Sequence, residues 1–162
     1  MIAFIALGAN LGDPASTLRE AVRALEATGK IKINKKSSLY RTAPVDSSGP
    51  DYVNAVIEVS TTEKSEELLR TLLRVEKLFG RVRPDGIINA PRTLDLDLLL
   101  CGNLIRKTPI LTLPHPRMHQ RAFVLVPLLE IEPEIVIPGL GKASQFLAGV
   151  SDQKIEKLDS KF

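Results

Sequence analysis

Two aspartates separated by one leucine, Asp95 and Asp97, are the residues of this sequence best suited to chemistry. They fall in an apolar run, Leu94 to Leu100, whose composition predicts a β-strand. Since side chains alternate along a strand, both carboxylates should lie on one face, and Leu94, Leu96 and Leu98 on the other. Adjacent carboxylates repel each other unless a cation lies between them, and oxygen ligands suit Mg²⁺. An exposed acidic edge strand would give the same pattern, but we favour a metal site.

Cationic residues and two histidines flank the acidic strand in the sequence. The preceding loop contains Arg81 and Arg92, and arginines on a loop can neutralise phosphates, although a merely solvated loop would look the same. His115 and His119 follow the strand at helical spacing, with a proline between them and no glutamate after His115. The zinc-protease motif is therefore absent. We interpret these histidines as polar groups for a phosphate or hydroxyl.

Three further side chains each allow two interpretations. Tyr52 and Asn54 share one face of a predicted strand that ends at Thr61, where they could stack on and hydrogen-bond a flat heterocycle. A tyrosine packed at a sheet edge explains the pattern equally well. Glu76 lies on or beside the apolar stripe of a predicted helix. It is either a surface carboxylate or one held for a ligand.

The elements that must position these residues follow the order β-α-β-β-α-β, with a helical C-terminal part. This order predicts an α+β fold with a ferredoxin-like core, in which helices pack on one side of an antiparallel sheet. The predicted strands are 2–7, 31–40, 52–61 and 94–100, a turn and short strand occupy 103–113, and the predicted helices are 14–29, 65–80, 122–131 and 143–150.

Composition narrows the class of protein. The chain has 162 residues, so we expect one domain covering 1–162. A net charge of +3, evenly spread, argues against nucleic-acid binding. No apolar run is long enough to span a membrane, and Cys101 is the only cysteine, which fits a reducing compartment. We therefore expect a cytoplasmic protein.

Six motifs in register resemble one family. They are Ala6–Gly12, Ser37–Pro44, Asp51–Ala55, Gly80–Arg83, Ala90–Asp97, and Leu113–His115 followed by Arg121–Phe123. Together they resemble the 6-hydroxymethyl-7,8-dihydropterin pyrophosphokinases, folate-pathway enzymes that transfer diphosphate from ATP to the pterin hydroxymethyl group. The resemblance extends from Ile2 to about Pro138. Each motif alone is weak, but six in the right order and spacing are specific.

The resemblance implies two Mg²⁺ ions and roles for individual residues. Asp95 and Asp97 would hold the metal ions, and Arg81 and Arg92 would be catalytic as they neutralise the phosphates. Contacts with ATP are implied for Glu76, Arg92, Leu98, His115 and Arg121. Contacts with the pterin are implied for Thr42, Ala43, Val45, Tyr52, Asn54 and Phe123, with the two aromatic rings stacked on opposite faces of the pterin.

Two departures from the family pattern concern the pterin pocket. Many members carry a tryptophan in the loop before the Ala-Pro-Arg-Thr motif, and here that region is Ile87–Asn89. Many also carry an aromatic residue where this chain has Pro116. Two other functions use the same residues, a two-metal phosphoesterase and a non-catalytic ligand sensor. The flat-ring contacts argue against the first, and the aspartates would be surplus in the second; we expect a monomer that binds ATP and the pterin.

Overall fold

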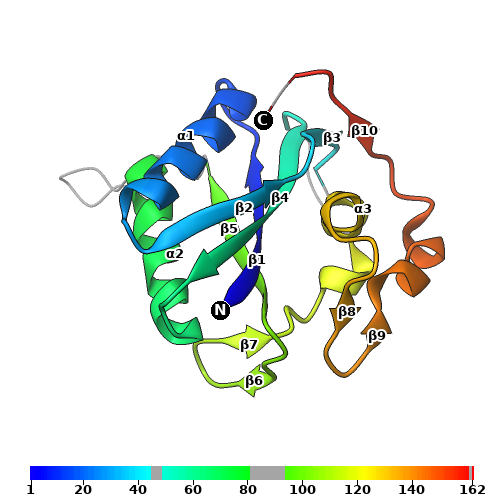
Figure 1. Ribbon diagram of the computed structural model, residues 1–162. Coiled ribbons are helices and arrows are strands. Elements are labelled where there is room, and N and C mark those ends of the chain that lie inside the picture. Colours follow the sequence, from blue (N-terminus) through cyan, green and yellow to red (C-terminus); the bar gives the residue numbers. More distant parts are fainter. Residues whose placement is uncertain (45–48, 81–93, 161) are drawn as a thin grey trace.

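The computed structural model describes residues 1–44, 49–80, 94–160 and 162 (Figure 1). Its main sheet has the strand order β10-β3-β4-β1-β5, with β2 also paired to β4, and every pairing is antiparallel. The strands of this sheet are β1 Ile2–Ala9, β2 Ile31–Lys36, β3 Tyr40–Thr42, β4 Tyr52–Thr61, β5 Asp95–Cys101 and β10 Glu156–Lys157. The predicted ferredoxin-like α+β core is confirmed.

The predicted strand 31–40 is divided into β2 and β3, which pair with β4 in succession. Ser37 lies between them and is buried. Its hydroxyl accepts the backbone N–H of Val56 at 2.9 Å, and its own N–H donates to the Val56 carbonyl at 2.9 Å. A side-chain oxygen thus replaces a backbone carbonyl in the ladder, which interrupts the strand while leaving no buried donor unpaired.

Helices α1 (Pro14–Ala27) and α2 (Ser65–Phe79) cover one face of the sheet (Figure 1). Their apolar stripes pack against the odd-numbered residues of β1 and against Leu96 and Leu98 of β5. The predicted start of α1 is confirmed, since the Asp13 carboxylate accepts the Ser16 N–H at 3.2 Å as an N-cap. The buried residues contributed by these two helices are Leu18, Ala21, Val22, Leu25, Leu68, Leu72 and Val75.

The opposite face is covered by α3 (Ala122–Ile131) and the residues after it, so the expectation of helices on one side holds only for α1 and α2. Helix α3 matches its predicted bounds and contains Pro127. The predicted helix 143–150 is instead two 3₁₀ turns. The remaining elements are β6 Arg106–Lys107, β7 Thr112–Leu113, η1 Met118–Gln120, β8 Val136–Ile137, β9 Gly141–Lys142, η2 Ala143–Phe146 and η3 Ala148–Val150.

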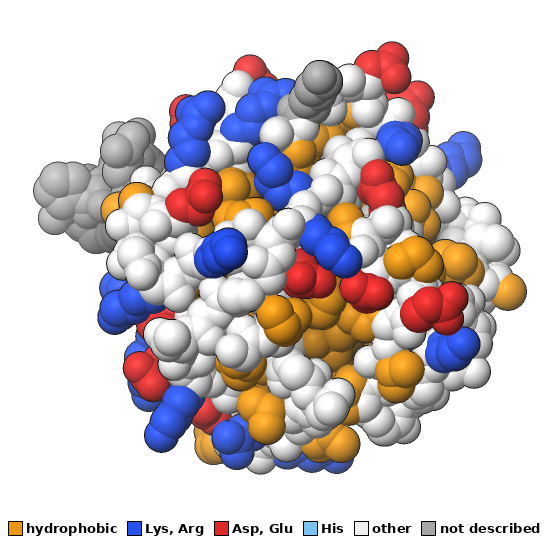
Figure 2. All heavy atoms as spheres, in the orientation of Figure 1, with side chains coloured by type: hydrophobic (Ala, Val, Ile, Leu, Met, Phe, Trp, Pro, Cys, Tyr) orange, Lys and Arg blue, Asp and Glu red, His pale blue; other side chains and the backbone are white. Residues whose placement is uncertain are grey.

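Charges of both signs mix on the face that carries β2 and α3. Figure 2 shows lysines and arginines among aspartates and glutamates there, and Lys35 lies 3.2 Å from Glu132 and 3.9 Å from Glu58. Oppositely charged side chains therefore lie next to one another on this face. Among the described residues, no helix combines the length and apolar character needed to cross a bilayer.

Candidate functional site

One row of residues crosses four strands of the sheet. Gly8 on β1 is the register partner of Asp95 on β5 and of Asn54 on β4, and Asn54 in turn pairs with Tyr40 on β3. Residues directly opposite in an antiparallel sheet project from the same face. The acidic strand and the Asn54 amide therefore lie on one face, separated by two strand spacings, or about 9.5 Å.

The acidic strand alternates as predicted. Leu94, Leu96 and Leu98 are buried in the core beneath α1 and α2, whereas Asp95 is exposed and Asp97 half-buried on the other face. The Leu98 side chain points into that core, so only its backbone could contact a nucleotide.

Glu76 is not a surface carboxylate, and its predicted contact with a ligand stays a prediction. It is buried on α2, and its carboxylate accepts the backbone N–H of Leu96 at 2.7 Å. Strand β5 is an edge of the main sheet, so this N–H needs a partner from outside the sheet. The contact fixes β5 at the residue between the two aspartates. Spacing could place Glu76 near the helix stripe but could not reveal which strand atom it reaches.

The Asn54 amide is hydrogen-bonded to Thr42 and lies over Gly8. Its amide Nδ2 donates to the Thr42 hydroxyl at 2.6 Å, and both residues are buried. A Cβ built on Gly8 would lie 3.0 Å from Asn54 Oδ1 and 4.0 Å from Tyr52 Cδ1. Gly8 therefore leaves the space that the Asn54 amide occupies. The sequence pattern predicted a strand that ends before Gly8, because a glycine beside an Asn-Leu-Gly run suggests a loop.

His115 lies in the electrostatic neighbourhood of Asp97. Burial lowers its pKa, the Asp97 carboxylate raises it, and the positive charges of Arg121 and Arg117 lower it further, with a net shift downward. Its Nδ1 accepts the Arg117 N–H at 3.2 Å, so in the neutral ring the proton is on Nε2. The structure thus brings together three of the predicted phosphate-binding and metal-binding side chains.

Arg121 and Phe123 contact each other at the start of α3. The guanidinium carbon lies 5.4 Å from the centre of the phenyl ring, and both side chains are half-buried. One face of the ring is therefore covered by a cation. A flat acceptor would stack on the other face or displace the guanidinium.

Three predicted site residues, Arg81, Arg92 and Val45, lie outside the described residues. Ala43 is described and exposed at the end of β3. Within the described part of the chain, no group of three or more His, Cys, Asp or Glu side chains is arranged to hold a metal. Two aspartates still suit Mg²⁺, which proteins commonly hold with one or two carboxylates together with substrate phosphates.

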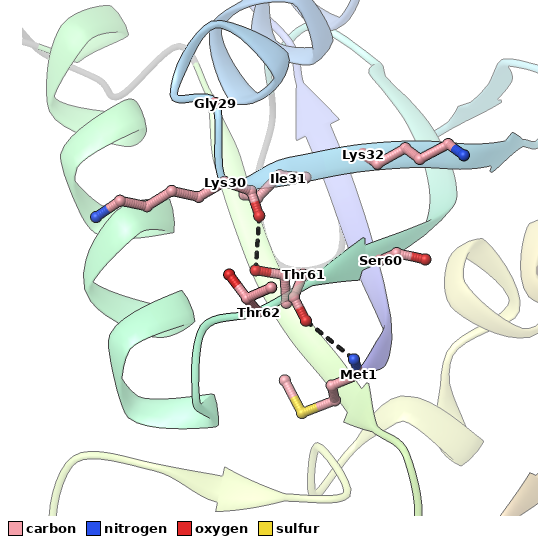
Figure 3. A pocket seen from close by; sticks show the side chains of 8 residues that line it. All are labelled: Met1, Gly29, Lys30, Ile31, Lys32, Ser60, Thr61 and Thr62. Carbon is pink, nitrogen blue, oxygen red and sulfur yellow. Dashed lines mark hydrogen bonds between the residues drawn. The ribbon is translucent and has the colours of Figure 1, made fainter.

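A cavity of about 430 Å³ lies at the far end of β1, about 20 Å from Gly8 by the rise of a strand. Its lining is Met1, Gly29, Lys30, Ile31, Lys32, Ser60, Thr61 and Thr62. Figure 3 shows Lys30 and Lys32 pointing in opposite directions, while the Thr61 hydroxyl donates to the Lys30 carbonyl and the Met1 amino group to the Thr61 carbonyl. None of these described lining residues is acidic or aromatic, so we assign no chemistry to this cavity.

The ferredoxin-like sheet, with a polar row on one face, defines a small α+β protein. A family model described as 7,8-dihydro-6-hydroxymethylpterin-pyrophosphokinase (HPPK) matches residues 4–133. The chain belongs to this family.

Two relatives illustrate the similarity. The 2-amino-4-hydroxy-6-hydroxymethyldihydropteridine pyrophosphokinase of Haemophilus influenzae is 40% identical over 158 residues, which cover 97% of this chain and 98% of the relative. The enzyme of the same name from Bacillus subtilis is 41% identical over 131 residues, covering 80% of this chain and 77% of the relative.

A solved structure supports the fold. The crystal structure of HPPK-DHPS in complex with substrates matches with a TM-score of 0.71 and 14% identity over 91% of this chain. The match covers 42% of that longer chain, so this chain spans less than half of its length. At this identity the likeness concerns the fold alone.

Proposed function

We propose that this chain transfers the diphosphate group of ATP to the hydroxymethyl group of 6-hydroxymethyl-7,8-dihydropterin, giving AMP and the pterin diphosphate in folate biosynthesis. Family membership supports the transfer and the acceptor. The observation that carries the proposal is the row in which Asp95 and Asn54 flank Gly8 on one sheet face. It offers an acidic pair for a metal-bound polyphosphate and, two strands away, an amide for a flat acceptor.

In the proposed reaction the hydroxymethyl oxygen bonds to the β-phosphorus of ATP. The bond from that phosphorus to the oxygen bridging it to the α-phosphate breaks, AMP leaves with the electron pair, and the hydroxyl proton passes to water. Such in-line transfer depends on positioning and charge rather than on a covalent intermediate. Bound Mg²⁺ would supply positive charge to the phosphate oxygens.

Individual residues take the following proposed roles. Asp95 and Asp97 would hold two Mg²⁺ ions, with Glu76 fixing their strand through Leu96. His115 would donate from Nε2 to a phosphate oxygen, because its Nδ1 already accepts a backbone N–H. Arg81, Arg92 and Arg121 would neutralise the triphosphate, with the backbone of Leu98 beside the nucleotide. Contacts with the pterin would come from Thr42, Ala43, Val45, Tyr52, Asn54 and Phe123.

The proposal extends to a monomer of one domain, 1–162, in the cytoplasm. The packing of the C-terminal residues Ile137, Ala143 and Val150 into the core under α3 supports a single domain. Cys101 is buried, and burial together with the Glu66 charge raises its pKa to about 11. Its thiol therefore stays protonated at neutral pH, and with one cysteine in the sequence it has no partner for an internal disulfide.

The test follows AMP in the presence of Mg²⁺, ATP and the pterin. We expect pterin-dependent AMP; phosphate released without pterin would indicate a phosphoesterase, and no turnover would leave a ligand sensor. Asp97→Asn should lower turnover by about 10³-fold or more, since it removes a metal ligand but conserves shape. The matched control Asp159→Asn changes an exposed aspartate after β10 and should behave like the parent protein. Near-normal turnover of Asp97→Asn would refute the metal assignment.

A further inference from the structure

We infer that Gln153 is a positioning residue for substrate binding, and that it acts by holding the backbone on both sides of Arg121. The inference rests on the proposed function, because Arg121 and Phe123 are the site residues that it concerns. Gln153 lies in the C-terminal segment, residues 151–158, which follows the part of the chain matched by the family model. Spacing alone gave no sign of this role.

Both polar groups of the Gln153 amide are bound to one short piece of backbone. The Oε1 atom accepts the N–H of Ala122 at 2.8 Å, and the Nε2 atom donates to the carbonyl of Gln120 at 2.9 Å. These two peptide groups flank Arg121. Because both peptide groups bind one planar amide, the backbone position of Arg121 is restricted, and with it the starting point of the Arg121 side chain.

The contact also supplies a missing helix cap. Arg121 is the N-cap residue of α3 and its side chain makes no capping hydrogen bond. The first N–H groups of a helix have no partner within the helix, and Gln153 provides one from 31 residues away. Phe123 follows in the first turn, so the cap fixes the beginning of the helix that carries the proposed stacking ring.

The C-terminal segment is itself anchored at both ends. At its start the Gln153 N–H donates to the carbonyl of buried Val150 at 3.0 Å. At its end β10 pairs with β3, and the Leu158 N–H donates to the Leu39 carbonyl at 2.8 Å (Figure 1). Strand β3 carries Thr42, which accepts the Asn54 amide. The segment thus connects the α3 side of the site to the β3 side.

The first experiment compares Gln153→Ala with Gln145→Ala by steady-state kinetics. Gln145 belongs to the same C-terminal part, but its amide donates to the Leu140 carbonyl at 2.8 Å, away from the site residues. Gln153→Ala should raise the KM values for ATP and pterin by about 3- to 10-fold with kcat changed less than about twofold, because it loosens binding groups without removing them. Gln145→Ala should match the parent protein. Equal KM values in all three folded proteins would overturn the inference.

The second experiment does not depend on activity. Hydrogen–deuterium exchange should become faster at Ala122 in Gln153→Ala, because its N–H loses its acceptor. Gln153→Glu keeps that acceptor and loses the donor to Gln120, so it should restore protection at Ala122. Unchanged exchange in Gln153→Ala would overturn the inference. If the parent protein formed no pterin-dependent AMP, the proposed function would fail, while the exchange result would still report on Gln153.

Discussion

Replacing Gly8 with alanine tests how closely the acceptor side of the site is packed. The added Cβ would lie 3.0 Å from Asn54 Oδ1, which is closer than ordinary van der Waals contact by a few tenths of an ångström. The amide cannot retreat easily, because its Nδ2 already lies 2.6 Å from the Thr42 hydroxyl and both residues are buried. The loss or distortion of one hydrogen bond to the pterin, about 1–1.5 kcal/mol, corresponds to about a tenfold rise in its KM.

The same substitution should have little effect on stability or on ATP. Alanine in place of a strand glycine contributes about 0.5–1 kcal/mol of stability, which offsets the strain at Asn54. Among described residues, the new methyl group meets only Asn54 and Tyr52 within 4 Å. The KM for ATP should therefore change less than about twofold.

The assay is AMP formation at saturating Mg²⁺, first with varied pterin at saturating ATP and then with varied ATP at saturating pterin. Gly149→Ala is the matched control, because a Cβ there meets nothing within 4 Å and the backbone has no positive φ. A Gly8→Ala protein that folds normally and keeps the parent's pterin KM would refute the argument. A rise in the ATP KM as large as that for pterin would also refute it, because the methyl group would then disturb the metal side.

Two further predictions concern stability. Glu76→Ala should lower the free energy of unfolding, measured by chemical denaturation, by about 2–3 kcal/mol, because the buried N–H of Leu96 loses a charged acceptor. Glu76→Gln should recover most of that stability, and Lys77→Ala, an exposed change on the same helix, is the control. Equal stability of all the variants would contradict the role of Glu76. The second concerns Glu130, whose carboxylate accepts the Tyr40 hydroxyl at 2.8 Å. Burial raises the pKa of this carboxyl, but hydrogen bonds from Ser38 and Tyr40 outweigh burial and hold the pKa below its usual 4.5. The contribution of the Glu130 carboxylate to stability is therefore present above pH 4.5 and lost as the pH falls below it. Glu130→Gln should lower the free energy of unfolding by about 1–2 kcal/mol at neutral pH and by almost nothing at pH 3. A stability difference between variant and parent that stays constant across this pH range would count against the argument.

The sequence predicted those parts of the fold that depend on local periodicity. The alternation around Asp95 and Asp97 placed the carboxylates opposite the core, and the apolar stripes of α1 and α2 gave both helices. The shared face of Tyr52 and Asn54 also followed from the period of two in a strand. Each of these features is decided by residues within one element.

Features decided by contacts between distant residues could not be predicted. Ser37 divides a strand because its hydroxyl reaches Val56, and Glu76 reaches a backbone N–H 20 residues away. Gln153 binds across 31 residues. Side-chain bonds to distant backbone leave no periodic pattern, so composition and spacing do not reveal them. The sheet face that α3 covers was missed for a related reason. Apolar residues lie on all sides of α3, so its sequence does not indicate which face of the sheet it packs against.

The row through Gly8 has a consequence for acceptor selectivity. The distance between the acidic strand and Asn54 spans two backbone hydrogen-bond ladders, one on each side of β1, and does not depend on side-chain rotamers. Strand separation in a sheet varies by only tenths of an ångström. In the proposed site, substitutions around Tyr52 or Phe123 would therefore alter how strongly a ring is held, whereas the main chain would set the length of acceptor that fits between ring edge and phosphate.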